Sequence, residues 1–137
     1  MRVQPIIERL SGIGLVTIGG ALEYAALTKI PGRLPAAFVV PQNKSAAETR
    51  RAGVVDQKIA MLFAVVIILP MPRSGAASAA TDLEEMEAKI LERMIGWTHP
   101  DADRETQFAD ASMLSADGTG LAWGMRFRTS YHFRKAA

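Results

Sequence analysis

The chain has 137 residues, of which 49% are hydrophobic and 22% charged, and its formal net charge is +2. These values are typical of a single globular domain rather than a disordered chain, and so small a positive excess is weak evidence for a nucleic-acid-binding protein. The sequence contains no cysteine, which excludes disulfides, thiol catalysis and cysteine-ligated metals.

The N-terminal part of the chain predicts short elements separated by glycine and proline. Residues 5–10 are expected to form a short helix, because proline suits the first helical turn and glycines follow the segment. Residues 15–18 predict a short strand. Residues 21–27 predict a second short helix or an irregular segment, and their alanine and leucine content favours the helix. Residues 36–40, bracketed by prolines, predict another short strand.

A polar stretch and an apolar stretch come next. Residues 42–53 show no apolar period, so we expect a long, mobile loop of the kind that often carries contacts. Residues 59–69 are all apolar; as a helix they would rise only about 16 Å, short of a membrane's roughly 30 Å core. Their β-branched second half predicts a central strand buried on both faces. Residues 54–60 fit either a helical turn or a strand at a sheet edge.

The clearest helix is predicted over residues 81–97. Thr81 and Glu84 belong to the segment TDLE, which has the pattern of a capping box at a helix start. Together with Asp82 and Glu85, Glu84 makes the start of this helix acidic, which suits the positive end of its dipole. Apolar residues recur at helical spacing along it, namely Leu83, Met86, Ile90, Leu91, Met94, Ile95 and Trp97.

The C-terminal part of the chain predicts a β-hairpin. Residues 107–114 form its first strand, SADGTG its turn, and residues 121–133 alternate with a period of two. One side of this second strand is apolar and aromatic, and the other carries Arg126, Arg128 and Arg134. The whole chain therefore predicts one α+β domain, residues 1–137, with a mixed or antiparallel sheet flanked by helices.

No residue pattern indicates an enzyme. The segment HPDAD, with His99, Asp101 and Asp103, superficially resembles a metal cluster, but aspartates are common in turns, so a plain turn is the better interpretation. The glycines near the N-terminus lack the third position of a dinucleotide fingerprint, and the serines lack the context of a nucleophile elbow. We expect no catalytic residue, no cofactor and no metal.

The basic side of the last strand has three interpretations. A solvated sheet face is the plainest of them. Nucleic-acid binding usually needs a larger basic excess, with aromatic residues among the basic ones. A protein interface is the third, because arginine is enriched at such contacts and the acidic helix of a neighbouring copy offers carboxylates. A head-to-tail homo-oligomer of this kind is physically reasonable.

Several segments in succession resemble a known family. They are MRVQPIIERL at the N-terminus, then GGALEYAAL, PAAFVVP, a glutamine at position 57 ahead of FAVVIIL, DLEEMEAKILERMIGW and LAWGMRFRTSYHFR. In this order and spacing they resemble the small tail terminator proteins of long-tailed bacteriophages and prophages, over nearly the whole chain. No single motif is diagnostic, and the specificity lies in the succession.

The resemblance implies a structural, non-enzymatic virion protein with an α+β fold. Proteins of this type form a ring, usually a hexamer, on the head-proximal end of the tail tube; they stop the addition of tube subunits and then present a docking surface to head-completion or connector proteins. The implied partners are further copies of the chain, the tail tube protein and the head-completion protein. DNA would only pass through the lumen, no membrane is involved, and assembly would take place in the host bacterial cytoplasm.

Two alternatives to this function stay open at the level of the sequence. A tail-tube or neck connector subunit would share the ring habit. A small nucleic-acid-binding module would instead use the basic C-terminal strand, and its DNA affinity would depend steeply on salt.

The resemblance supplies no motif that assigns roles to residues, so the candidate contacts rest on physical argument. Candidates for a ring interface or a lumen-facing patch are the charged residues Arg126, Arg128, Arg134, Asp82, Glu84 and Glu85. Candidates for contact with an axial neighbour are the loop residues Lys44, Glu48, Arg50 and Arg51. The core is expected to hold Ile90, Trp97, Trp123 and Phe127.

Overall fold

A five-stranded sheet forms the centre of the molecule in a computed structural model that describes residues 1–27, 33–46, 48, 53–72 and 75–136. The strand order is β1-β2-β3-β5-β4. Its strands are β1 (Thr17–Gly20), β2 (Ala36–Ala46), β3 (Val54–Pro70), β4 (Gln107–Ala116) and β5 (Gly120–Ala136). β1 pairs parallel with β2 and the other pairs are antiparallel, so the expected mixed sheet is confirmed.

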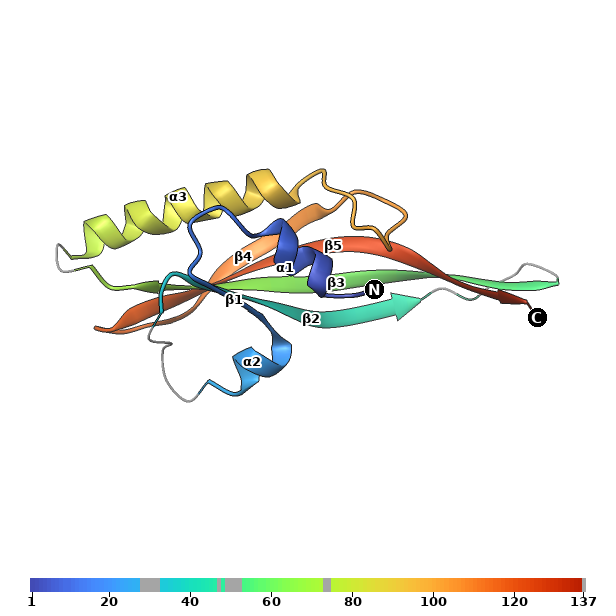
Figure 1. The fold of residues 1–137 in the computed structure, drawn as a ribbon, viewed down its shortest axis with the longest axis horizontal. Helices are drawn as coiled ribbons and strands as arrows, with labels where there is room; N and C mark the ends of the chain where they lie inside the picture. The colour runs from blue at the N-terminus through green and yellow to red at the C-terminus, as the bar shows by residue number, and fades with distance from the viewer. Residues whose placement is uncertain (28–32, 47, 49–52, 73–74, 137) are drawn as a thin grey trace.

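Helices flank the sheet on both of its faces, as Figure 1 shows. They are α1 (Gln4–Arg9), α2 (Ala21–Ala25) and α3 (Ala76–Met94). α1 and α3 cover one face, which we call the helix face, and α2 lies against the other, which we call the α2 face. The fold is therefore α+β as predicted, although strands contribute more of it than helices. None of the helices described is long and apolar enough to cross a membrane.

The main core lies between the helix face of the sheet and the two helices above it. Phe63 and Phe127 are about 1% and 0% exposed and stack with ring centroids 5.7 Å apart. Ile90 of α3, also buried, belongs to the same cluster. Trp97 and Trp123 are only partly buried at its margin. The four predicted core residues therefore pack in or against one core.

The long apolar segment forms the middle of the sheet. β3 pairs with β2 on one side and with β5 on the other, and its residues 63–69 are buried. The predicted central strand over residues 59–69 is thus confirmed. Residues 54–60 continue the same strand, so of the two alternatives for that segment the strand is correct.

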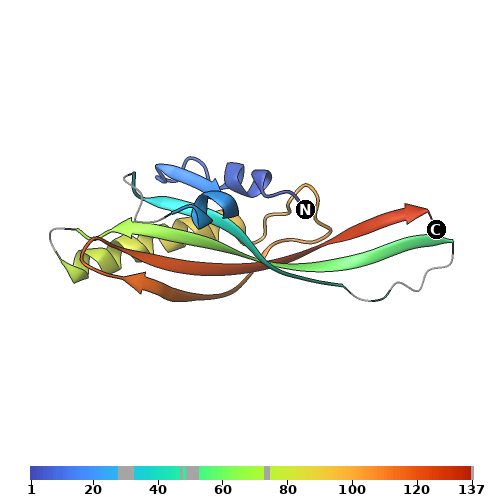
Figure 2. The same cartoon turned by 90° about the horizontal axis from the view of Figure 1, so that it is seen from below.

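β3 and β5 extend past the rest of the sheet. Each has 17 residues, which at about 3.3 Å per residue gives a length of roughly 55 Å. Pairing with β2 ends at Ala46 opposite Ile59. Beyond it, residues 54–58 and 132–136 form a two-stranded ribbon, here called the arm. Figures 1 and 2 show the arm leaving the body, with the C-terminus at its tip.

The predicted loop over residues 42–53 is wrong in its first part. Residues 42–46 belong to β2, which continues along β3 after a register irregularity between Pro41 and Asn43. These residues are exposed, and all but Ala46 are polar, because this stretch of the sheet extends beyond the core. The pattern that suggested a loop is therefore that of a solvent-exposed strand. Residues 47 and 49–52 lie outside the described part.

The long helix is displaced toward the N-terminus from its predicted range of 81–97. It begins after Gly75, whose φ is +96°, and ends at Met94. Thr81 lies inside the helix, where its hydroxyl donates a hydrogen bond to the carbonyl of Ala77 (3.2 Å). The capping box predicted at Thr81 is therefore wrong. The alanine-rich segment before it joins the helix because alanine has the highest helix propensity.

The C-terminal hairpin is confirmed. Its turn is held by Asp117, whose carboxylate accepts the backbone N–H groups of Thr119 (2.7 Å) and Gly120 (3.1 Å). The short elements also form: α1 and α2 lie close to their predicted ranges, while β1 begins two residues later than the predicted strand.

Candidate functional site

The three arginines of the last strand lie on one face of the sheet, as the alternation predicted. In the antiparallel register, Arg126 is opposite Ala64, Arg128 opposite Leu62 and Arg134 opposite Asp56. Residues that pair across strands point to the same side, so all three arginines project from the α2 face, away from α3. Toward the other end of β5, the same face becomes apolar and packs near α2.

Arg126 is neutralised within the chain. Its guanidinium donates two hydrogen bonds to the carboxylate of Asp110 on the neighbouring strand β4. The hydrogen bond from Arg126 holds the pKa of the Asp110 carboxyl below its ordinary value, and the same bond raises the pKa of Arg126. This pair is a bidentate contact across two strands and leaves no free charge at that position.

Arg134 belongs to a larger cluster at the base of the arm. Its Nε lies 3.2 Å from Asp56, whose side chain is 8% exposed. The ring of His132 lies between two carboxylates, with Nδ1 2.6 Å from Asp56 and Nε2 2.6 Å from Asp103. A hydrogen bond from Ser130 is the main cause of the lowered pKa of the Asp103 carboxyl. Acidic and basic groups therefore alternate here.

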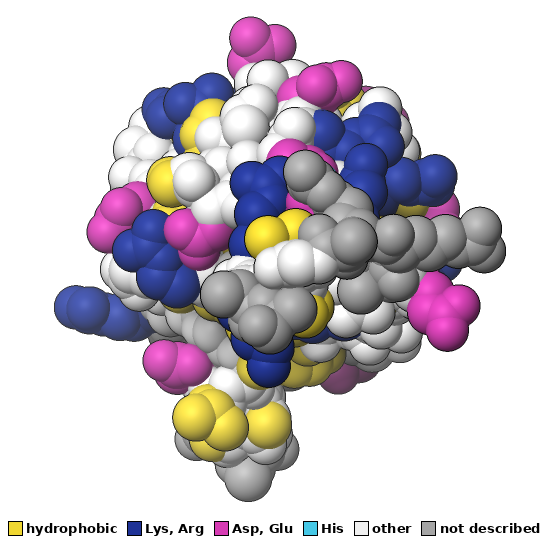
Figure 3. Space-filling view, turned by 90° about the vertical axis from the view of Figure 1, so that its right-hand side faces the viewer, with side chains coloured by type: hydrophobic (Ala, Val, Ile, Leu, Met, Phe, Trp, Pro, Cys, Tyr) yellow, Lys and Arg dark blue, Asp and Glu magenta, His cyan; other side chains and the backbone are white. Residues whose placement is uncertain are grey.

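Arg128 differs from the other two arginines. Its side chain is exposed, and it makes no ion pair with any residue that the structure describes. Figure 3 looks onto the end of the molecule that bears the arm and shows acidic and basic side chains intermixed. The sequence pattern thus overstates the positive charge of this face, because the compensating aspartates come from β3, β4 and a loop.

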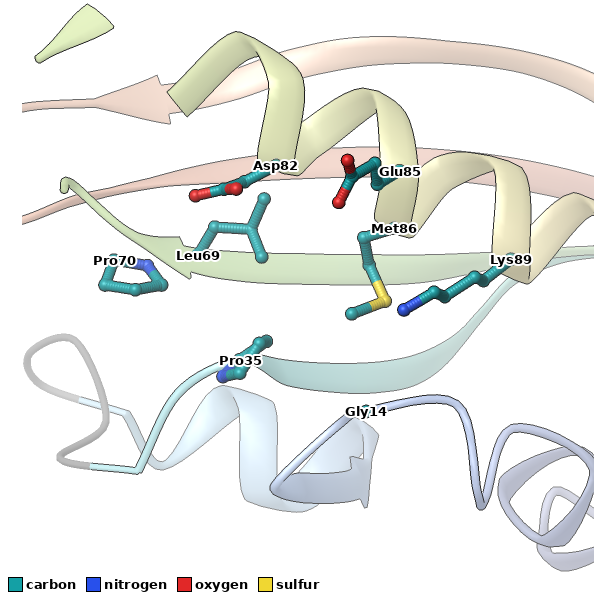
Figure 4. A pocket seen from close by; sticks show the side chains of 8 residues that line it. All are labelled: Gly14, Pro35, Leu69, Pro70, Asp82, Glu85, Met86 and Lys89. Carbon is teal, nitrogen blue, oxygen red and sulfur yellow. The ribbon is translucent and has the colours of Figure 1, made fainter. Parts of the chain in front are cut away.

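The predicted acidic residues lie on the opposite side of the sheet. Asp82, Glu84 and Glu85 are exposed on α3, above the helix face. Asp82 and Glu85 border a cavity of about 250 Å³, here called the groove. It is lined by Gly14, Pro35, Leu69, Pro70, Asp82, Glu85, Met86 and Lys89 (Figure 4). The structure therefore does not bring the acidic and basic candidates together within one subunit.

The loop candidates are separated from one another. Lys44 lies on β2 rather than in a loop, and its ammonium sits 5.6 Å from the ring centroid of Tyr131 on β5. Glu48 is exposed. Arg50 and Arg51 lie outside the described residues. The expected axial contact at these positions therefore stays a prediction.

A buried histidine stabilises the turn after α3. The sequence predicted the turn but not this role of the histidine. His99 is 1% exposed. Its Nδ1 accepts the backbone N–H of Asp101 (2.9 Å), which leaves the Nε2 proton to bond the carbonyl of Arg2 (2.6 Å). Burial lowers the pKa of this ring. The role was missed because nothing in HPDAD indicates that the N-terminus packs against it.

The aspartates of the same segment tie it to two distant parts of the chain. Asp101 accepts hydrogen bonds from the guanidinium of Arg2 (3.0 and 3.1 Å), and these hold the pKa of its carboxyl far below the ordinary value. Asp103 reaches β5, where its backbone N–H bonds the carbonyl of Ser130 (2.9 Å). The described residues contain no group of three potential ligands placed to hold a metal ion.

Comparison with known proteins gives one family and a shared fold. A family model described as "Phage tail terminator protein" matches residues 1–137, the whole chain. A solved structure described as the virion of a native gene transfer agent particle contains a chain of similar fold, with a TM-score of 0.54 and 15% sequence identity. That match covers 90% of this chain and 84% of the other. No curated protein matches the sequence.

Proposed function

Because the chain belongs to the phage tail terminator protein family, and is thus a structural protein of a phage tail, we propose that it closes the head-proximal end of the tail tube. In this proposal identical copies form a ring, with six as the expected number. The ring ends the polymerisation of the tube and then offers its outer side to the proteins that complete the head. The partners of the chain are its own copies, the tube protein and a head-completion protein.

The observation that carries the ring is the placement of unlike charges on opposite sides of one subunit. The carboxylates of Asp82, Glu84 and Glu85 project above the helix face, and Arg128 projects from the α2 face. A contact between two different patches is heterologous, and a heterologous contact repeated by rotation can close into a ring. Each copy then uses both patches at once, one for each neighbour.

The charge pairing on the α2 face bears on the passage of DNA. Arg126 and Arg134 are held by Asp110 and Asp56. Arginines already bound to carboxylates release fewer counterions from a phosphate backbone, and such release supplies the affinity of unspecific DNA binding. If this face borders the lumen, DNA can move along it without being held. The alternative of a DNA-binding module is correspondingly less well supported.

The test of the ring is native mass spectrometry across a concentration series, with negative-stain images of the same samples. Closed rings of one size are expected. Stacked tubes of increasing length would contradict the terminator function and identify a tube subunit instead. A monomer at every concentration, combined with salt-sensitive binding of duplex DNA, would favour the nucleic-acid-binding module.

A variant tests the basic face directly. Arg126→Ala combined with Arg128→Ala is expected to weaken ring formation and tail joining, because it removes the exposed cation and the partner of Asp110. The control is Arg104→Ala, which removes an arginine that is also exposed but lies in the loop before β4. Normal rings from the double variant would show that this face is not the ring interface.

A further inference from the structure

The arm carries apolar side chains that are exposed to solvent. Phe133 is 53% exposed and Val54 is 39% exposed. Phe133 and Lys135 are two residues apart on β5 and so lie on the same side of the ribbon. Lys135 is exposed and makes no ion pair within the described part of the chain. An aromatic ring and an exposed ammonium group therefore lie on one side of the arm, near its tip.

The groove has the complementary composition. Its floor includes Leu69 and Met86, which are 3% and 6% exposed, and the carboxylates of Asp82 and Glu85 stand at its edge on α3 (Figure 4). Neither carboxylate has an ion-pair partner among the residues described. Lys89 is the one cation among the lining residues that the structure describes, and against it stand the two carboxylates of Asp82 and Glu85.

The size of the groove suits a side chain of another protein rather than a small molecule. Its volume of about 250 Å³ is below the roughly 300–1,000 Å³ usual for small-molecule pockets. Asp82 and Glu85 are three residues apart on α3, so their side chains are neighbours on the helix surface. Two adjacent carboxylates beside an apolar floor match an aromatic ring followed by an ammonium group on one side of a strand.

The arm and the groove lie at opposite ends of the same strand. Val54 begins β3 within the arm, and Leu69 and Pro70 end it at the groove. The 17 residues of β3 separate the arm tip from the groove by roughly 55 Å, so the arm does not reach the groove of its own subunit. The two surfaces can therefore meet only between copies, and such a contact is again heterologous.

We propose that the arm tip of one copy docks into the groove of the next, with Phe133 against Leu69 and Met86 and Lys135 between Asp82 and Glu85. The inference rests on the proposed ring and adds the segments in contact, with Lys135 of the arm, in place of Arg128, as the cation that meets Asp82 and Glu85. Phe133 supplies the apolar anchor of the interface and Lys135 fixes its register. The same contact then buries the exposed apolar side chains of the arm and gives the carboxylates of Asp82 and Glu85 a cation as partner.

Disulfide trapping tests this contact, because the chain has no cysteine of its own. The double variant Lys135→Cys with Asp82→Cys is oxidised at a concentration where the wild type forms rings. A ladder of covalent oligomers is expected, since a disulfide forms where Cβ atoms approach within about 4.5 Å. Each single variant should give at most a dimer. The matched control is Lys135→Cys with Glu92→Cys, in which the second cysteine lies on α3 but not at the groove.

The outcomes separate this contact from the ring itself. Rings that do not cross-link, or that cross-link equally well through position 92, would overturn the contact between arm and groove and leave the proposed function standing. Cross-linked open chains without closed rings would support the contact and contradict the ring. Absence of both ladder and rings would overturn both proposals.

Affinity measurements give a second test that does not depend on oxidation. Phe133→Ala is expected to weaken self-association roughly 10- to 100-fold, as is usual for loss of an aromatic anchor at an interface. Lys135→Glu and Asp82→Lys should each weaken it, and the combined variant should recover part of the loss. Association that is unchanged by Phe133→Ala, in a variant that unfolds like the wild type, would refute the proposal.

Discussion

Phe127 and Phe133 are the same residue type on the same side of the same strand, and they differ in burial. Phe127 is 0% exposed, with its ring centroid 5.7 Å from that of Phe63 and 5.6 Å from that of Phe108. Phe133, in the arm, is 53% exposed. Changing each to alanine therefore measures how much of the stability of the fold comes from the body and how much from the arm.

The expected costs of the two changes differ several-fold. Phe127→Ala should lower the free energy of unfolding by about 3–5 kcal/mol, of which each lost ring pair contributes about 0.5–1.5 kcal/mol. Against a total stability of about 5–15 kcal/mol this is severe, and the melting temperature should fall by roughly 10–20 °C. Phe133→Ala removes a ring that is half in water and should cost less than about 1 kcal/mol.

The assay is urea unfolding followed by far-UV circular dichroism, at a dilution where the protein is monomeric. Dilution matters because association would add its own stabilisation to the wild type. Equal costs for the two alanine variants would refute the reasoning, since the arm would then be as tightly packed as the body. If Phe133→Ala lowered the free energy of unfolding strongly at high protein concentration alone, the loss would instead measure the contribution of the interface between copies.

Three further predictions concern single contacts. The free energy of unfolding should decline on acidification from about pH 6.5, because burial lowers the pKa of His99 and the unfolded chain therefore binds a proton at this ring first. His99→Gln should flatten this part of the pH profile of urea unfolding. The decline below about pH 3.8, where aspartates with lowered pKa values are protonated, should remain. Trp123→Phe removes the indole N–H that bonds Glu87 (2.7 Å) and should cost about 1–3 kcal/mol, whereas Glu87→Gln, which keeps an acceptor oxygen, should cost less; equal losses in chemical denaturation would contradict this. Thr81→Ala should be neutral or raise the melting temperature slightly, because Thr81 lies inside α3; a loss of about 1 kcal/mol would mean that it caps the helix after all.

The sequence predicted those elements in which burial alternates regularly along the chain or is the same at every position. The apolar run of residues 59–69 can be satisfied only in the middle of a sheet, and the alternation after Leu121 only with one side against a core. The same reasoning failed for residues 42–46, because a strand that leaves the core has exposed polar side chains like those of a loop. The polarity of a residue indicates whether it is buried. This pattern indicates the backbone conformation only in elements that pack against the core.

The charged candidates show a second limit. Alternation placed Arg126, Arg128 and Arg134 on one face correctly, but it could not identify the aspartates that neutralise two of them. Asp110 and Asp56 come from other strands, and their positions opposite the arginines depend on strand order and register. The groove was missed for the same reason, since its lining residues come from four separate parts of the chain.

The ladder between β3 and β5 runs through 17 consecutive pairs without a register irregularity, whereas the β2–β3 ladder contains one and the β4–β5 ladder contains two. This continuity restricts how the reach of the arm can change in evolution or design. One residue added to each strand keeps the hydrogen bonds but turns every side chain beyond it to the opposite side. Two residues added to each strand preserve the sides and lengthen the arm by about 6.6 Å. The length of the arm can therefore change only in steps of two residues per strand. Subunits that differ by one such step would not fit together in the same ring.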